Sequence, residues 1–96
     1  MTIKHHFAAD AYVREMHIPA GHKGKKHTHT YDHISILGYG TVVVCVDNSM
    51  TVYNAPSCIE IKAGKEHEVL AVTDAVWYCI HGTTDEITDL HTVEVE

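Results

Sequence analysis

Short apolar runs alternate with polar positions along the chain, and turn-forming residues separate them. Such alternation is typical of β-strands, in which successive side chains point to opposite faces of a sheet. The pattern predicts strands at residues 12–18, 27–29, 33–37, 41–47, 50–53, 58–61, 67–72 and 76–82, with a last one at 90–95. Many short strands with turn signals between them indicate an all-β barrel or sandwich.

The residues between these runs fit tight turns. Glycines flank Tyr39 where two strands meet, and the segment 47–49 reads Asp-Asn-Ser, in which Asp and Asn tolerate the left-handed conformation of a hairpin turn. No longer window carries a 3.6-residue period. We therefore expect little or no helix, at most single turns near residues 8–12 and 85–90.

The length and charge of the chain restrict its class. Ninety-six residues predict a single domain, 1–96, that buries only about 60–65% of its unfolded surface, so a bound metal or a partner subunit would add needed stability. A formal net charge of −6 argues against nucleic acid or a membrane surface as a partner. Neither a membrane span nor a signal peptide is expected, and a cytoplasmic location is predicted.

Histidine is the unusual component, with ten in 96 residues, and it favours metal binding or proton handling. The three cysteines, Cys45, Cys58 and Cys79, have no CxxC spacing. They are expected to be reduced and mostly buried, with Cys45 and Cys58 filling the core.

Four histidines have the spacing of metal ligands. His27 and His29 lie two apart on a predicted strand and so share one face, while a turn at 30–32 can bring His33 opposite them. His67 opens another strand after a glycine-containing turn. Four imidazole nitrogens suit iron, nickel or zinc, with manganese, cobalt or copper as alternatives, and do not suit magnesium or calcium. The spacing alone can arise by chance in a chain this rich in histidine.

Glycines frame the first three of these histidines. The string Gly21-x5-His27-x-His29-x3-His33-x6-Gly40 resembles the first cupin motif, G(x)5HxH(x)3,4E(x)6G, at every spacing. The one departure is His33, which stands where the motif has glutamate.

A second segment resembles the second cupin motif, PxGxxH. Gly64 and His67 keep the offset of that motif, and Lys62 replaces its proline. The two motifs and the hairpin between them cover roughly half of the chain. The sequence thus resembles a small single-domain cupin of the RmlC-like superfamily.

The resemblance implies a double-stranded β-helix of two facing antiparallel sheets with a metal near its wider mouth. By position, His27, His29 and His67 match the three histidine ligands of the family and His33 matches its glutamate. An all-histidine site would be more positive than the usual one. The alternative is a site of three histidines without His33, as in some iron-dependent cupin dioxygenases.

Strand parity supplies candidates for the lining of a pocket. Ser35 shares a face with His33, and Tyr31 is a candidate for the rim. On the strand at 76–82, the inward set is either Trp77, Cys79 and His81 or Val76, Tyr78 and Ile80. If the first set faces inward, Cys79 and His81 join the pocket candidates, and His81 is a possible general base or ligand contact. His5, His6, His17, His22 and His91 are left as surface or unassigned residues.

Three function classes follow, and the fold does not choose among them. The first is oxygen-dependent cleavage of a small chelating substrate such as a diketone, enol or thiol. The second is a metal-dependent isomerase or lyase without redox chemistry, and the third a non-catalytic ligand-binding or structural module. No cluster of carboxylates or arginines is expected in the interior, which favours the first or third class. A homodimer is also expected, with the N-terminal segment 1–12 packing on the partner subunit.

Overall fold

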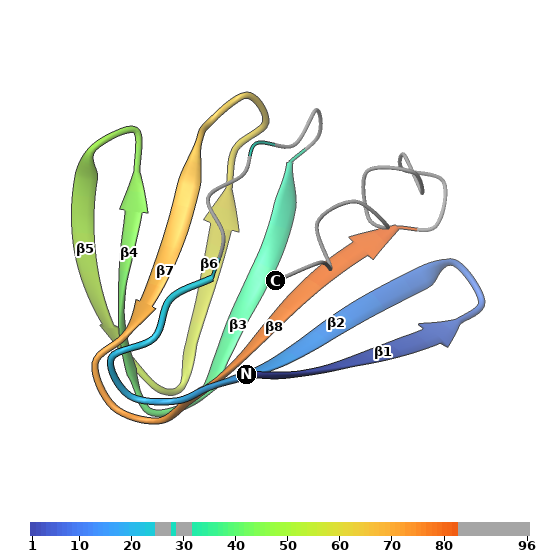
Figure 1. Cartoon of the computed structure of the whole chain (residues 1–96). Helices are drawn as coiled ribbons and strands as arrows, with labels where there is room; N and C mark the ends of the chain where they lie inside the picture. The colour runs from blue at the N-terminus through green and yellow to red at the C-terminus, as the bar shows by residue number, and fades with distance from the viewer. Residues whose placement is uncertain (25–27, 29–31, 83–96) are drawn as a thin grey trace.

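All of the regular structure in the computed structural model, which describes residues 1–24, 28 and 32–82, is β-strand (Figure 1). The strands are β1 (Thr2–Ala8), β2 (Ala11–Ile18), β3 (His33–Tyr39), β4 (Thr41–Val46), β5 (Ser49–Asn54), β6 (Ser57–Ile61), β7 (His67–Ala71) and β8 (Ala75–Gly82). The all-β fold class is confirmed. The strands expected at 27–29 and 90–95, and the helical turn at 85–90, lie outside the described residues. None of the described segments forms a helix that could cross a membrane.

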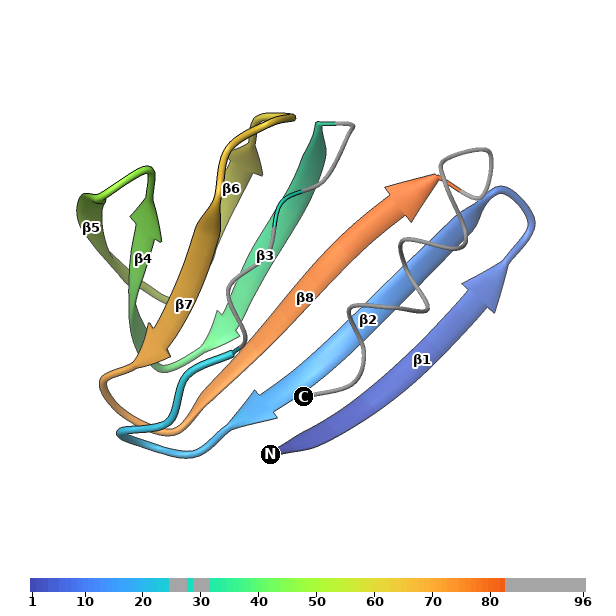
Figure 2. The same ribbon diagram turned by 45° about the horizontal axis from the view of Figure 1, so that its top comes forward.

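Two antiparallel sheets face each other. One has the strand order β1-β2-β8-β3-β6 and the other the order β5-β4-β7. Figure 2 shows the smaller sheet standing opposite β6 and β3, with β1 at the far edge of the larger sheet. The space between the sheets therefore receives every second side chain of each strand.

The core is built from these inward positions. On β2 the buried residues alternate from Tyr12 to Ile18, and on β8 they alternate from Ala75 to His81. A cluster of buried apolar side chains joins both sheets and includes Met16, Ile18, Leu37, Val42, Val44, Ile59, Ile61, Val69, Ala71 and Trp77. Each large aliphatic or aromatic side chain buried in this way contributes about 1.5–3 kcal/mol to folding.

The N-terminal segment forms a β-hairpin. Instead of a helical turn, β1 and β2 form a hairpin in which Ala8 pairs with Ala11 and Thr2 with His17. The turn is closed by Ala9, whose φ of 47° is left-handed. No helical turn forms at 8–12, because pairing of β1 with β2 extends the sheet along the whole segment. Packing of residues 1–12 on a partner stays a prediction.

The cysteines occupy three different environments, and all three are free thiols. Cys79 is buried, Cys45 is half-buried and Cys58 is exposed. The expectation that Cys58 fills the core is wrong, because Ile59 and Ile61 take the inward positions of β6 and parity turns Cys58 outward. A cytoplasmic location stays a prediction.

Candidate metal centre

His33 and His67 come from opposite sheets and meet in the interior. His33 is the first residue of β3 and His67 the first residue of β7, and their side chains are 5% and 4% exposed. Their ring centroids are 5.5 Å apart. A metal–nitrogen bond to imidazole is about 2.0–2.1 Å, so one ion between the rings can contact a nitrogen of each.

A third buried imidazole, His81, lies beside this pair. Its ring stacks on that of His33, with centroids 5.0 Å apart and an interplanar angle of 28°. Tyr12 continues the row, with its ring centroid 5.8 Å from that of His81. The open choice on β8 is thereby decided: Trp77, Cys79 and His81 face inward.

Of the remaining site and pocket candidates, Ser35 lies among the described residues. Ser35 is fully buried on the same face of β3 as His33, and its hydroxyl donates to the Cys79 sulfur at 3.8 Å. His27, His29 and Tyr31 lie outside the described residues. The structure therefore brings together two of the four expected ligands and places Ser35, Cys79 and His81 on the inner face near them.

The chain that leads to His27 and His29 runs along β7. The Gly21 N–H donates to the Ala71 carbonyl at 2.8 Å, and the Gly24 N–H donates to the Val69 carbonyl at 3.1 Å. This antiparallel course carries the chain from the end of β7 toward its beginning, where His67 lies. Gly24 therefore lies beside Val69, which is two residues from His67 along β7.

Hydrogen bonds join the segments that precede β3 and β7. Asp32, the residue before His33, accepts a hydrogen bond from the Ala63 N–H at 2.8 Å. Lys62, which replaces the proline of the second motif, lies 3.9 Å from the same carboxylate. The ion pair is exposed and contributes little, but the hydrogen bond to the backbone fixes the turn before His67 relative to His33.

A second carboxylate holds the other side of that turn. Asp47, the residue after β4, accepts a hydrogen bond from the Glu66 N–H at 3.1 Å, and its own N–H donates to the Glu66 carbonyl at 3.0 Å. Gly64 within the turn has a φ of +77°, a conformation that glycine adopts without strain. The turn that leads into His67 is thus held at Ala63 by Asp32 and at Glu66 by Asp47.

The expectation that the interior holds no cluster of arginines or carboxylates overlooked one buried arginine. Arg14 is 2% exposed, and its Nη2 donates to the Met16 sulfur at 3.2 Å. Its signal was present in the sequence, because Tyr12, Arg14, Met16 and Ile18 alternate on one predicted strand and parity gives them one face. Arginine is seldom fully buried in proteins, and the packing of the two sheets overrides that tendency here.

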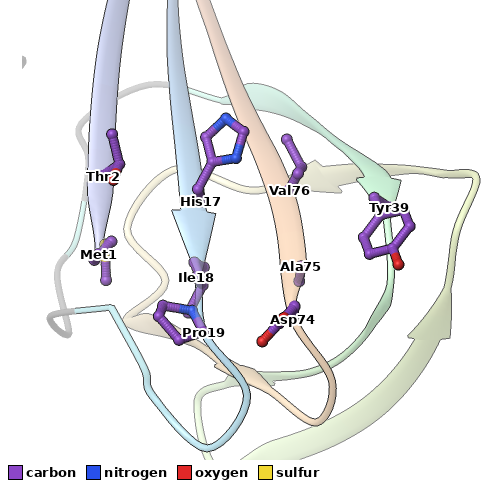
Figure 3. Close-up of a pocket in the computed structure, with 9 residues that line it drawn as sticks. All are labelled: Met1, Thr2, His17, Ile18, Pro19, Tyr39, Asp74, Ala75 and Val76. Carbon is purple, nitrogen blue, oxygen red and sulfur yellow. The ribbon is translucent and has the colours of Figure 1, made fainter.

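Among the described residues, the buried histidines lie at the end of the barrel where β3 and β7 begin. At the other end, where β2 ends and β8 begins, an open hollow of about 340 Å³ is lined by Met1, Thr2, His17, Ile18, Pro19, Tyr39, Asp74, Ala75 and Val76 (Figure 3). None of the buried histidines lines this hollow. The chemistry of the buried imidazoles therefore marks the better candidate site.

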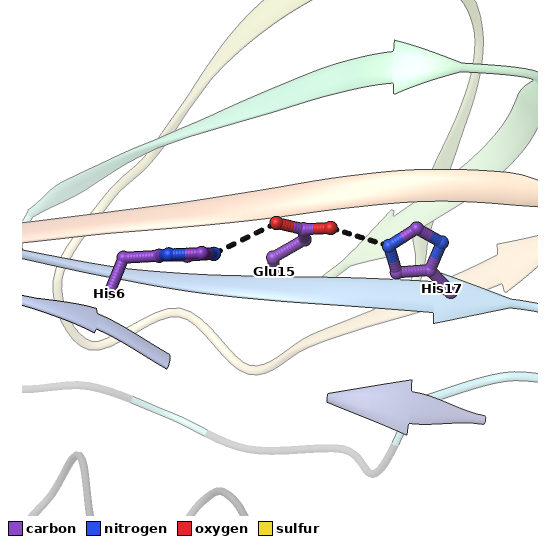
Figure 4. Close-up of polar contacts among 3 residues, drawn as sticks. All are labelled: His6, Glu15 and His17. Atoms are coloured by element: carbon purple, nitrogen blue, oxygen red, sulfur yellow. Dashed lines mark hydrogen bonds and ion pairs between the residues drawn. The ribbon is translucent and has the colours of Figure 1, made fainter. Parts of the chain in front are cut away.

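A separate histidine cluster lies on the outer face of the larger sheet. Glu15 bonds through one carboxylate oxygen to the His17 ring at 2.5 Å and through the other to the His6 ring at 2.9 Å (Figure 4). The hydrogen bond from His17 has the larger effect and that from His6 adds to it, and together they hold the pKa of Glu15 below its ordinary value. His6 and His17, unassigned from the sequence, are thus partners of a surface carboxylate.

The residues of the interior fit a transition metal in their chemistry. His33 and His67 are buried, face one another and offer nitrogen donors, which borderline divalent metals prefer. Within residues 1–24, 28 and 32–82 taken alone, no three metal-binding side chains are grouped closely enough to hold an ion. A site with three or more such ligands would have to include side chains from the rest of the chain.

Comparison with known proteins agrees with this architecture. A model of the cupin domain matches residues 14–81. Among solved structures, KdgF from a Halomonas species is 15% identical, with a TM-score of 0.76 over 90% of this chain and 81% of that one. An RmlC-like cupin from Shewanella frigidimarina is 18% identical, with a TM-score of 0.72 over 85% of this chain and 74% of that one.

A larger enzyme contains the same fold. A salicylate 1,2-dioxygenase variant from Pseudoaminobacter salicylatoxidans, in complex with gentisate, is 10% identical, with a TM-score of 0.72 over 85% of this chain but 22% of that one. No curated protein matches the sequence. At these identities the solved structures establish the fold and leave the reaction undecided.

Proposed function

The chain belongs to the cupin family, and from that premise we propose that it binds one divalent transition metal through His27, His29, His33 and His67. The observation that carries the proposal is the meeting of His33 and His67, buried on opposite sheets with ring centroids 5.5 Å apart. These two residues occupy the positions of metal ligands in the two sequence motifs. The course of residues 21–24 toward His67 adds support, because His27 and His29 follow a few residues later.

Iron, nickel or zinc suits this donor set best, with manganese, cobalt or copper as alternatives. When bound, such a metal supplies a Lewis acid with open positions for a small chelating ligand. His33 in place of a carboxylate leaves the charge of the ion uncompensated, so anionic ligands gain affinity. A site of three histidines, with His33 beside it, is the second arrangement.

We propose oxygen-dependent cleavage of a small chelating substrate as the reaction. The support is the all-nitrogen donor set and the buried apolar residues Val69 and Ala71, which share the inner face of β7 with His67. The protein's own contribution is to exclude water and to fix the ligand against the buried rings. A second candidate is a metal-dependent isomerase or lyase. It is favoured by His81, which stacks on His33 and could accept a proton from a bound ligand.

Metal uptake tests this proposal. Purified protein is loaded separately with Fe(II), Ni(II), Zn(II) and Mn(II), and elemental analysis is expected to find about one ion per chain. Element-specific anomalous diffraction is expected to place that ion between His33 and His67. Protein that takes up none of these metals would contradict the proposal. Oxygen uptake with acetylacetone then supports the first reaction, whereas conversion without oxygen uptake supports the second.

The outer face of the larger sheet favours a homodimer. Ile34 is 47% exposed and pairs with half-buried Ile80, while half-buried Ile36 pairs with half-buried Tyr78. These neighbours form an apolar surface across β3 and β8. Since small soluble chains rarely leave such a surface uncovered, we propose that a second copy of the chain covers it.

Size-exclusion chromatography with light scattering checks this proposal. The expected mass is twice the 10.7 kDa of one chain, and Ile34→Lys is expected to yield the monomer because it places a charge within the apolar surface. Val52→Lys, on the other sheet at a residue that is 61% exposed, is the matched control and should leave the dimer intact. A wild-type mass near that of one chain would rule the dimer out.

A further inference from the structure

The end of the barrel opposite the buried histidines carries two open hollows that meet at one tyrosine. The first is the hollow of about 340 Å³ described above, and Tyr39 lies at one side of it (Figure 3). The second has a volume of about 540 Å³, and Tyr39 lines it together with Gly38, Gly40, Thr41, Asn54 and Thr73. Tyr39 belongs to both hollows and is 63% exposed. Its ring is therefore accessible to a ligand that reaches from one hollow into the other.

Hydrogen bonds fix the chain segments that form the floor of these hollows. The Thr41 carbonyl accepts a hydrogen bond from the Val72 N–H at 2.9 Å, and the Thr41 N–H donates to the Thr73 hydroxyl oxygen at 3.0 Å. The Asp74 Oδ1 accepts a hydrogen bond from the Ala20 N–H at 2.9 Å. Because these contacts join segments far apart in the sequence, the floor is ordered before a ligand arrives, which lowers the entropic cost of binding.

The side chains around the hollows offer both hydrogen-bond donors and acceptors. Asn54 uses Oδ1 to accept from the Thr41 hydroxyl at 2.8 Å, so its Nδ2 group remains able to donate to a ligand. Asp74 uses Oδ1 for the Ala20 N–H, which leaves Oδ2 able to accept. Among the described residues that line the two hollows there is no lysine or arginine, and Asp74 is the one carboxylate. This lining disfavours anions and suits a neutral ligand that is rich in hydroxyl groups.

We propose that the two hollows bind a neutral oligosaccharide that lies across Tyr39. A sugar ring has an apolar face of C–H groups, which packs on an aromatic ring, and a rim of hydroxyl groups that both donate and accept hydrogen bonds. With one sugar on Tyr39, its neighbours lie over the two hollows, where Asn54 is on one side and Asp74 on the other. The site does not depend on the proposed metal, because Tyr39 ends β3 whereas His33 begins it.

Titration with uncharged tetrasaccharides tests the proposal. Cellotetraose, mannotetraose and maltotetraose are added separately to the wild-type protein, and amide NMR spectra are recorded at up to about 10 mM sugar, where even weak binding is detected. At least one sugar is expected to bind and to shift the amide signals of Thr41, Asn54, Thr73 and Asp74. The affinity should be the same in zinc-loaded and in metal-free protein.

Variants of the shared tyrosine test its role. Tyr39→Ala should weaken binding about tenfold or more, whereas Tyr39→Phe keeps the ring and should stay within about threefold of the wild type. Phe7→Ala is the matched control, because Phe7 is an aromatic residue of similar exposure, 65%, which pairs with Tyr12 near the β1–β2 turn. It should leave the affinity for the sugar unchanged.

Four results would each overturn the proposal. The first is that no tetrasaccharide shifts the amide signals of the wild type, a result that requires no variant to fold. The second is binding of benzyltrimethylammonium without binding of any sugar, which would assign the hollows to organic cations that pack on Tyr39. The third is sugar binding that requires zinc, which would place the sugar at the proposed metal centre. The fourth is full affinity in folded Tyr39→Ala.

Discussion

His67→Ala is expected to abolish stoichiometric metal binding and to lower the thermal midpoint of the metal-loaded protein by about 10–20 °C. Loss of an outer-shell partner already weakens metal binding about 10–100-fold, so loss of a buried ligand should weaken it further. Metal at a hundred times its dissociation constant adds about 2.7 kcal/mol to folding. In a domain of this size each kcal/mol corresponds to about 4–8 °C.

Elemental analysis and calorimetry of loaded and metal-free protein check this prediction. His22→Ala is the matched control, because His22 is exposed on the chain that follows β2 and its loss should change neither quantity. His33→Glu should still bind, since it restores the usual carboxylate, and His33→Ala should bind more weakly than the wild type. Undiminished metal content in His67→Ala would remove that residue from the ligand set.

Gly40→Ala is expected to destabilise the protein by about 3 kcal/mol or more, without direct contact with the metal site. Gly40 joins β3 to β4 with a φ of +88°, a conformation that strains any residue with a Cβ atom. A Cβ here would lie 2.1 Å from the Asp74 carbonyl oxygen, which is backbone and cannot rotate away. Strain and collision therefore act together.

Gly21→Ala separates the two effects. Gly21 has a similar φ of +82°, but a Cβ there would meet no atom within 4 Å. It should cost only the strain, about 1–2 kcal/mol. Urea denaturation of both variants measures the difference in free energy of unfolding. Equal losses in the two variants would show that the collision at Gly40 is relieved by movement of the chain.

The strand pattern could be predicted because alternation is a local property. Parity on β3 correctly placed His33, Ser35 and Leu37 inward and turned Ile34 toward solvent. The hairpin at Asp47 and Asn48 followed from their tolerance of positive φ, which the structure shows at 47° and 68°. These features depend on backbone conformation and side-chain spacing within a few residues.

Errors arose where the outcome depended on residues far along the chain. Residues 8–12 gave no clear local signal, and the pairing of β1 with β2 decided their conformation. The local sequence allows Cys58 to face either side of the sheet. Its outward direction is set by Ile59 and Ile61, which pack in the core between the sheets. On β8, both alternating sets were apolar enough to be buried, so local reasoning could not choose between them.

By itself, the sequence determined the all-β class and the cupin motifs, because glycine offsets and strand alternation are local. It also named His33 and His67 as members of one candidate site. Only the tertiary structure showed them 5.5 Å apart, since two sheets must face each other before residues at the starts of β3 and β7 can meet. The same packing buried Arg14 and His81 on the inner face: alternation assigns each of them to one face of its strand, but which face becomes buried depends on how the two sheets pack.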